Sequence, residues 1–471
     1  MKTKALNVVF LGGGSPRVLP IVRAAFDHGP VFDGGEIRLV DRDLARAGAV
    51  GHMIRCCPEF KKVDCNVTVT ADLDQALDGA DVVYITMAVG RIATSYRSLD
   101  ASLRRGFISS DNVSLSGAFY ALTAGPAILS FARRMEKRCP DAMMLIFANP
   151  VAVYSGMVNN HTKIRALGIC AGFVNHRWDL TRLLYGEDVA RDEYDVDVAG
   201  INHLSFILRG THRGQDLFKL LDRRLEGGYK PARLSATLKP ARRGQIDHGL
   251  RKLAWMHKRL GTIIFSTEWD GMAHLFHEEM FASALRAWKP LSKATLSREV
   301  RRDEKARVAA DARFQALVNA PPARAAWNPP YAANPRLAKW SDDVSVTLLK
   351  ALAGLETARI VASAPQRGAV EGFKPRTVME FSQLVDSKGA HPAGRFVIPD
   401  TLHPLITALA THQTLVGDAI ATEDPRVLAD ALFAYPVQFN TDAARELSRE
   451  LLAIHKAEIP AFCQAARPWL A

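Results

Sequence analysis

A triple-glycine turn stands between two differently patterned runs near the start of the chain. Residues 6–11 are apolar, as in a buried strand. Gly12-Gly13-Gly14 follows, and residues 16–27 are amphipathic, as in a helix. A second short apolar run, 36–41, ends in Asp41. Glycines let the backbone approach a pyrophosphate at a helix N-terminus, and a carboxylate after the second strand can bond a ribose diol. The order predicts a dinucleotide-binding unit, with an ordinary strand-to-helix turn as the alternative.

Asp41 favours NAD over NADP, because its carboxylate suits the ribose 2′-hydroxyl and would repel a 2′-phosphate. The neighbouring Arg42 keeps NADP open as an alternative. The residues that we expect to contact the cofactor are Gly12, Gly13, Gly14, Ser15, Arg17, Asp41, Arg42 and Ala88.

The composition excludes several classes of protein. The 471 residues carry a net charge of +12, but the basic stretches 242–258 and 289–307 lack the interleaved aromatic residues of a nucleic-acid binder. The charge instead favours anionic substrates. No apolar run approaches the roughly 20 residues that cross a bilayer, and we expect no signal peptide. Six cysteines without a CxxC pair favour a reducing cytoplasm.

The first half of the chain alternates short apolar runs with helical patterns, which predicts a doubly wound parallel α/β sheet of the Rossmann type. Candidate strands are 6–11, 36–41, 66–69, 81–87, 143–147 and 167–171, and candidate helices are 16–27, 43–56, 73–78, 93–105 and 120–137. Antiparallel strands are expected at 194–200 and 203–209, before long helices and a surface loop at 321–335. We therefore predict a nucleotide-binding domain over 1–193 and a mixed α+β domain over 194–471 for substrate, metal and oligomerisation.

Three polar positions follow predicted strands and should lie near the nicotinamide. They are Asn149, Cys170 and the pair Asn202-His203. Taken singly, an Asn-Pro is often a turn, a cysteine is often a buried apolar group, and a lone histidine often belongs to the core. Together, a thiolate and an imidazole beyond a cofactor predict a divalent-metal site with open positions.

At these residues the chain resembles glycoside hydrolase family 4. The similar phrases are Leu11-Gly12-Gly13-Gly14-Ser15, Ala76-Leu77-Asp78-Gly79-Ala80-Asp81, Asn149-Pro150, Gly168-Ile169-Cys170 and Gly200-Ile201-Asn202-His203. The Asn149-Pro150-Val151 phrase is also shared with the wider lactate/malate dehydrogenase-like fold. The resemblance is clear over residues 5–285 and faint beyond.

This resemblance implies NAD-dependent glycoside hydrolysis rather than two-carboxylate chemistry. NAD⁺ takes hydride from C3 of the sugar, a base removes the acidified C2 proton, a divalent cation (usually manganese) stabilises the enediolate, and the aglycone leaves by elimination before water adds. It also implies that Cys170 and His203 bind the metal and that Asn149 and Asn202 contact the substrate. We expect a homodimer or homotetramer.

The chain departs from the family pattern in several places. Ala171 stands where relatives commonly carry a polar residue after the metal cysteine, which leaves Asn175 and His176 as the nearest substitutes. The family's glycine-rich loop over the sugar is reduced to residues 111–117, beginning at Asp111. Asp270 is the predicted base, although it could simply begin a helix, and His274 is predicted to point into the site.

Arg91 and Arg97 follow the fourth strand, where the family places anion-handling arginines, and solvated helix-face charges are the alternative. They favour an anionic sugar, but neither the sugar nor the anomer is defined by these residues. Two other functions stay open at this point: a plain NAD-dependent dehydrogenase of a sugar or hydroxy acid, and an inactive relative that binds NAD or a sugar.

Overall fold

The structure is a computed structural model that describes residues 4–27, 30–57, 59–87, 89–170, 172–189, 192–266, 269–276, 291–318, 342–435 and 441–470. Six parallel strands form the first part of the sheet, in the order β3-β2-β1-β4-β5-β6. Their bounds are β1 Asn7–Leu11, β2 Gly35–Val40, β3 Cys65–Thr70, β4 Val82–Ile85, β5 Met143–Ile146 and β6 Arg165–Gly168. This is the doubly wound order of a dinucleotide-binding sheet, so the predicted fold class is confirmed.

Helices connect these strands and pack in two groups, α1 with α2 and α3 with α5 and α6. Their bounds are α1 Val18–Asp27, α2 Leu44–Arg55, α3 Leu73–Leu77, α4 Ile92–Leu103, α5 Leu115–Arg138, α6 Val151–His161 and α7 Gly172–Tyr185. The first five match the predicted helices. α6 was not among the predicted helices because residues 151–158 are all buried, so this helix has no polar face to produce an amphipathic period.

The second half of the chain extends the same sheet. β7 (Tyr194–Ile201) and β8 (Leu204–His212) form the predicted antiparallel hairpin. The unpredicted strands β11 (Ala358–Pro365) and β12 (Val378–Asp386) lie between β6 and β7, with β11 against β6 and β12 against β7. Three short strands, β9 (Gln215–Asp216), β10 (Ile263–Ile264) and β13 (Gly389–Pro392), pair at the periphery. The sheet therefore crosses the proposed boundary between residues 193 and 194, and the division into two domains stays a prediction.

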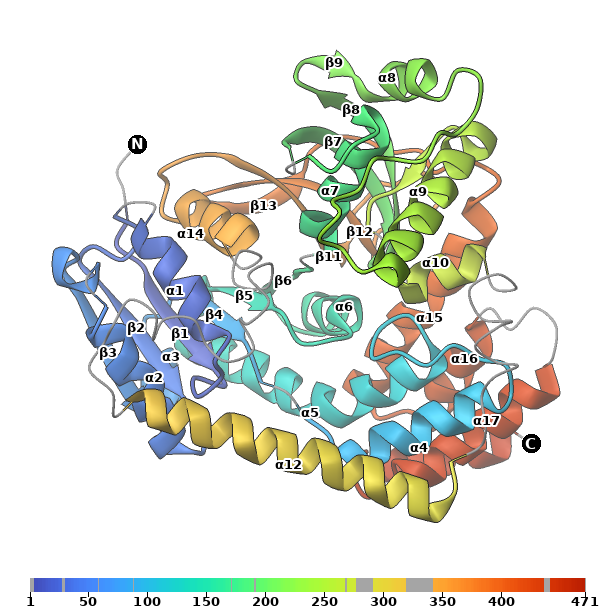
Figure 1. The fold of residues 1–471 in the computed structure, drawn as a ribbon. Coiled ribbons are helices and arrows are strands. Elements are labelled where there is room, and N and C mark those ends of the chain that lie inside the picture. Colours follow the sequence, from blue (N-terminus) through green and yellow to red (C-terminus); the bar gives the residue numbers. More distant parts are fainter. Residues whose placement is uncertain are drawn as a thin grey trace.

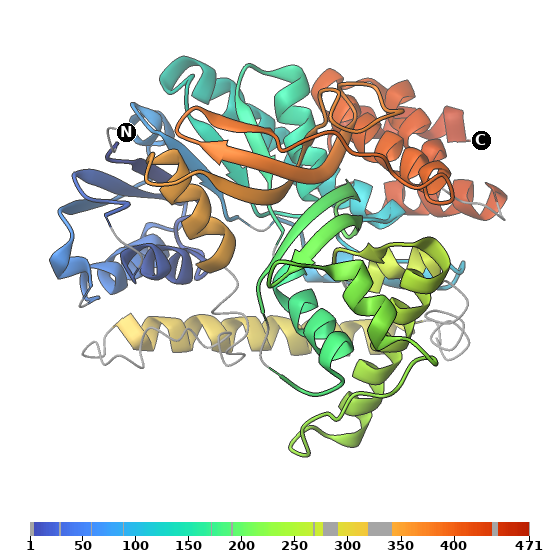
Figure 2. The same ribbon diagram turned by 90° about the horizontal axis from the view of Figure 1, so that it is seen from above.

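Further helices surround this sheet (Figures 1 and 2). Their bounds are α8 Leu217–Arg224, α9 Pro240–Leu260, α10 Trp269–Leu275, α12 Lys293–Val318, α14 Thr347–Leu352, α15 His403–Thr422, α16 Pro425–Ala434 and α17 Thr441–Ile454. α15 packs on α5 and α6, so the C-terminal helices rest on the first half of the chain. The loop predicted at 321–335 lies outside the described residues.

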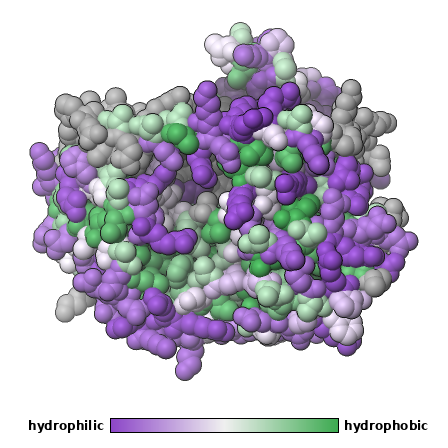
Figure 3. All heavy atoms as spheres, turned by 90° about the horizontal axis from the view of Figure 1, so that it is seen from below, coloured by the Kyte–Doolittle hydropathy of each residue, from purple (hydrophilic) through white to green (hydrophobic). Residues whose placement is uncertain are grey.

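α12 is a long helix that runs along one side of the molecule, from α4 to α2 (Figure 1). Seen from that side, the surface is mainly hydrophilic, with scattered apolar patches (Figure 3). By length and composition α5 could cross a membrane, but 67% of its most apolar window is buried in the protein. A helix so buried is typical of the core of a soluble protein.

Gly156 lets α6 lie directly on β12. This contact joins the first half of the chain to the second half. A Cβ at Gly156 would collide with the buried, stiff side chain of Val378. We expect Gly156→Ala to lower the free energy of unfolding by roughly 1–3 kcal/mol, as overpacking does. Gly48→Ala on α2 is the control, because nothing lies within 4 Å of its Cβ position. That variant should gain roughly 0.5–1 kcal/mol from helix propensity. Denaturant titration measures both, and equal effects would contradict the close packing.

Candidate active site

The glycine turn after β1 leaves no room for side chains. Gly12 has a φ of +91°, and a Cβ there would lie 2.7 Å from the backbone nitrogen of Met87. A Cβ at Gly13 would lie 2.7 Å from the Cα of Leu39. Asp41 follows β2, and its Oδ2 accepts a hydrogen bond from the Gly14 amide at 2.9 Å. The turn and the carboxylate predicted to bind the ribose therefore form one unit.

The other predicted cofactor residues lie around this turn. The Ser15 amide donates to the Gly12 carbonyl at 2.8 Å, and the guanidinium of Arg17 lies 6.0 Å from the ring centroid of Phe147, just after β5. Arg42 is exposed. Ala88 lies outside the described residues.

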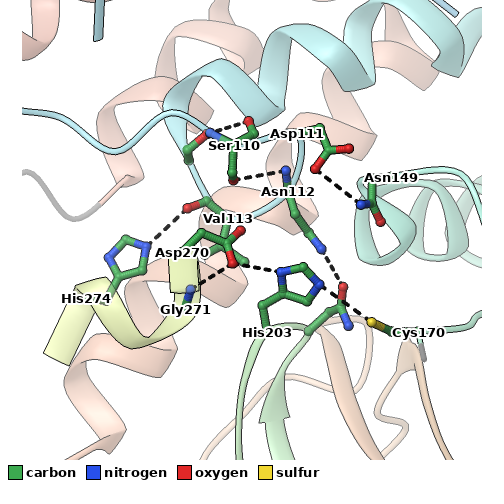
Figure 4. Close-up of polar contacts among 12 residues, drawn as sticks. Ser110, Asp111, Asn112, Val113, Asn149, Cys170, His203, Asp270, Gly271 and His274 are labelled. Atoms are coloured by element: carbon green, nitrogen blue, oxygen red, sulfur yellow. Dashed lines mark hydrogen bonds and ion pairs between the residues drawn. The ribbon is translucent and has the colours of Figure 1, made fainter. Parts of the chain in front are cut away.

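Cys170 and His203 are brought together from opposite sides of the β11–β12 insertion (Figure 4). Cys170 follows β6, and His203 lies in the turn between β7 and β8 with a φ of +69°. The Cys170 Sγ is 3.5 Å from the His203 Nε2. Sulfur and nitrogen ligands about 2.3 and 2.1 Å from one ion, at angles between right and tetrahedral, are roughly 3.1–3.6 Å apart. The separation therefore suits a shared metal ion.

Asp270, at the start of α10, fixes the ring of His203. The Nδ1 of His203 donates to the Asp270 Oδ1 at 2.8 Å, and the Gly271 amide donates to the same oxygen at 2.9 Å. A Cβ at Gly271 would collide with the His203 carbonyl, so α10 begins directly on the β7–β8 turn. This carboxylate–histidine pair turns Nε2 toward Cys170, as in metal sites where an outer carboxylate orients the ligand.

The charges of these groups support one another. Burial alone would lower the pKa of His203, but the charge of Cys170 and the hydrogen bond to Asp270 raise it well above 6.5. Burial would also raise the pKa of Asp270, but the hydrogen bond and charge of His203 lower it below 3.8. Asp270 is thus held ionised, which favours orienting the imidazole over accepting a proton. Its role as the base stays a prediction.

Glu380 on β12 is a buried carboxylate that sequence reasoning missed. Its two oxygens accept from the Asn202 Nδ2 at 2.8 Å and from the Ser205 Oγ at 2.6 Å. It therefore binds both sides of the turn that holds His203. Burial raises the pKa of Glu380 above 4.5, although these hydrogen bonds oppose the rise. No sequence signal near residue 380 could reveal this role, because the strand was not predicted and its partners are about 175 residues away.

The loop between α4 and α5 contributes the amide of Asn112 and the carboxylate of Asp111 to this cluster. Asn112 donates to the Asn202 Oδ1 at 2.6 Å, and Asn149 donates to the Asp111 Oδ1 at 3.2 Å. The Nε2 of His274 lies 3.1 Å from the Val113 carbonyl (Figure 4). Asn149, Asn202 and Asp111, the predicted substrate residues, are thus joined to one hydrogen-bonded loop.

Other predicted groups lie apart from this cluster or outside the described residues. Arg91 occupies the N-cap position of α4; its side chain is 74% exposed and its Nε lies 3.9 Å from Glu458. Arg97 is also exposed. Burial lowers the pKa of His176 to about 3, so its imidazole is neutral at physiological pH. It therefore does not supply the proton donor for which it was a candidate. Ala171 and the side chain of Asn175 lie outside the described residues. Among the residues that the structure describes, no group of three or more His, Cys, Asp and Glu side chains is placed to hold a metal ion, and Cys170 and His203 stay the predicted ligands.

Comparison with known proteins identifies the family. Residues 7–185 match the family 4 glycosyl hydrolases and residues 198–437 match their C-terminal domain. The chain therefore belongs to glycosyl hydrolase family 4, as the sequence resemblance implied.

Individual relatives cover nearly the whole chain. An alpha-galacturonidase of Thermoanaerobacter italicus is 23% identical over 92% of each chain. A probable 6-phospho-beta-glucosidase of Bacillus subtilis is 22% identical over 98% of each. The fold matches a 6-phospho-alpha-glucosidase from gut microorganisms solved with NAD and Mn²⁺, at a TM-score of 0.74 and 18% identity, covering 97% of this chain and 99% of the other. It also matches the Thermotoga maritima 6-phospho-beta glucosidase with manganese, NAD⁺ and glucose-6-phosphate, at a TM-score of 0.73 and 17% identity, covering 96% and 99%.

The role of Glu380 in holding the β7–β8 turn can be measured as stability. Glu380→Ala leaves the amide of Asn202 and the hydroxyl of Ser205 without their buried acceptor. We expect the free energy of unfolding to fall by roughly 2–4 kcal/mol. Glu371→Ala, at an exposed position, should change it by less than about 0.5 kcal/mol. Urea titration of both variants tests this, and a loss at Glu380 no greater than at Glu371 would disprove the role.

Proposed function

We propose that this family 4 glycosyl hydrolase cleaves O-glycosidic bonds by transient oxidation of the sugar at C3, with NAD and a divalent metal as cofactors. The observation that carries the proposal is the placement of the Cys170–His203 pair at the same sheet edge as the glycine turn and Asp41. The dehydrogenase and the inactive-relative alternatives are not favoured, since the family match spans both halves of the chain.

The glycine turn fits a dinucleotide. The Gly12 and Gly13 positions exclude a Cβ, so the backbone stays bare where a pyrophosphate would approach α1. Asp41 is fixed by the Gly14 amide and accepts a further hydrogen bond from the Asp43 amide at 3.0 Å. We propose that Gly12–Gly14, Ser15 and Arg17 face the pyrophosphate and that Asp41 binds the ribose diol. Such a cofactor supplies reversible hydride transfer.

The donor set fits a metal with open positions. Cys170 and His203 would hold the ion, leaving the remaining positions to substrate oxygens and water, where the ion would polarise a sugar carbonyl. A thiolate favours softer ions than manganese. We nevertheless propose Mn²⁺, because two solved relatives contain NAD and manganese.

The chain's own residues then have distinct tasks. Asp270 holds the Nδ1 proton of His203 and keeps Nε2 turned toward the metal position. Asn149, held by Asp111, is proposed to present its amide to the sugar hydroxyls. Asn202, whose amide is buried between Glu380 and Asn112, stays a proposed substrate contact from the family resemblance. Proton removal from C2 by Asp270 or His274 stays a proposal from the family resemblance. Arg91 and Arg97 stay proposed, from the family resemblance, to favour an anionic sugar.

We also propose a cytoplasmic homodimer or homotetramer that binds neither nucleic acid nor membrane. All six cysteines are free thiols, as a reducing compartment would keep them.

Metal binding separates the roles of Cys170 and Asp270. We expect Cys170→Ser to abolish measurable Mn²⁺ binding, because it removes one of two protein ligands. Asp270→Asn should weaken Mn²⁺ binding about 10- to 100-fold, because it removes the charge that orients His203. NAD binding should be unchanged in both variants. Equilibrium dialysis with metal analysis measures this, and equal metal content in the wild type and Cys170→Ser would exclude the assignment.

Proton exchange at C2 tests the reaction itself. A ketone at C3 acidifies the C2 proton, so a positioned base exchanges it with solvent. Products formed in D₂O should carry deuterium at C2, and aryl glycosides should release aglycone only with Mn²⁺ and without accumulating NADH. Stoichiometric NADH would instead support a dehydrogenase. Full retention of the C2 proton in an active, metal-loaded enzyme would reject the elimination. Neutral, phosphorylated and uronic-acid glycosides assayed side by side define the sugar.

A further inference from the structure

Arg46, in the first turn of α2, lies against the glycine turn and beside Asp41. Its Nε donates to the Gly14 carbonyl at 2.8 Å. A Cβ placed on Gly14 would lie 2.9 Å from the Arg46 Cγ and 3.0 Å from the Asp41 Oδ2. The stem of this arginine and the proposed ribose-binding carboxylate therefore meet at the same point of the backbone.

α12 reaches this point from a distant part of the sequence. The carboxylate of Asp311 pairs with the Nη1 of Arg46 across 265 residues. Toward its N-terminus α12 rests on α4 (Figure 1), and Asp303, near the middle of α12, accepts a hydrogen bond from the Tyr96 hydroxyl of α4 at 2.7 Å. Two nitrogens of the Arg46 guanidinium are thus engaged, one by Gly14 and one by Asp311.

NADP differs from NAD by a phosphate on the adenosine 2′-oxygen, and an arginine near the end of the second strand is the usual group that accommodates it. Arg46 has the right charge and position. Its ion pair with Asp311 neutralises that charge and fixes the guanidinium on the Gly14 carbonyl. With the charge of Arg46 offset by Asp311, the carboxylate of Asp41 beside the glycine turn is left to repel a 2′-phosphate.

We propose that Asp311 makes the chain selective for NAD over NADP by withholding Arg46 from the 2′-position of the adenosine ribose. The inference rests on the proposed NAD site. It assigns to α12, remote from the glycine turn in sequence, a part in choosing the cofactor.

The test is calorimetric binding of NAD⁺ and NADP⁺ to the wild-type protein and to Asp311→Asn and Asp311→Ala. Both substitutions are at a partly exposed helix position, and alanine also favours the helix. We expect NADP⁺ to bind about five- to tenfold more tightly to either variant, because the Nη1 group that Asp311 holds in the wild type can then make a charge-assisted hydrogen bond to the phosphate. NAD⁺ affinity should change less than about twofold, since the ribose diol bonds Asp41.

Three controls show whether the gain comes from Arg46. Asp303→Asn loosens α12 at the α4 end, so an equal NADP⁺ gain there would attribute the effect to helix docking and overturn the proposal. The gain should disappear in the double variant Asp311→Asn/Arg46→Ala. If the NADP⁺ gain persists in that double variant, or if it is lost only when Arg42 is replaced by Ala, the phosphate is bound by Arg42 and the proposal is overturned.

The outcomes also separate this inference from the proposed function. A wild-type protein that binds NAD⁺, with an unchanged NAD⁺ to NADP⁺ ratio in both Asp311 variants, contradicts the inference alone. A wild-type protein that binds neither cofactor contradicts both.

Discussion

The candidate site depends on the antiparallel insertion of β11 and β12 between β6 and β7. Gly168, near the end of β6, pairs with Ser363, and Gly200, near the end of β7, pairs with Glu380. These pairings fix the register of both flanking strands. Cys170 and His203 therefore lie at one edge of the sheet, with the Sγ of Cys170 3.5 Å from the Nε2 of His203. Without the insertion, the two halves would be a parallel sheet and a separate hairpin, and nothing would set the spacing of the two ligands.

A cluster of charges can be buried here because each charge has a partner. The Asp270 carboxylate faces the imidazole of His203, and the Glu380 carboxylate accepts two hydrogen bonds. An unpaired buried charge would be far more costly than either arrangement. A divalent metal held by Cys170 and His203 would displace the Nε2 proton of His203 and add one positive charge beside these carboxylates, since binding a metal and losing a proton are linked.

The sequence could predict the first half of this fold because its signals are local. A strand, a glycine turn, a helix and Asp41 all lie within residues 6–41, and the short helix predicted at 73–78 is α3, which the Asp72 side chain caps. It could not predict the insertion of β11 and β12 between β6 and β7, or the contacts of Glu380, since these depend on segments more than 150 residues away. The sequence singled out Asp270 as a candidate base, but its hydrogen bond to the Nδ1 of His203 is a tertiary contact that no local pattern reveals. The same limit applies to Asp311 and Arg46.

Neither Ala171 nor His176 offers a proton donor beside the predicted metal ligand Cys170. Position 171, next to Cys170, is an alanine, and His176 is kept neutral by burial, which lowers its pKa to about 3. Neither residue can protonate a leaving aglycone at physiological pH. In the proposed elimination, however, loss of the C2 proton comes first, and the electron density that it leaves helps to expel the group at C1. A direct displacement has no such source and depends on a protonated carboxylic acid. An alanine at position 171 is therefore compatible with the proposed elimination, whereas two-carboxylate hydrolysis would require a protonated acid beside the leaving group.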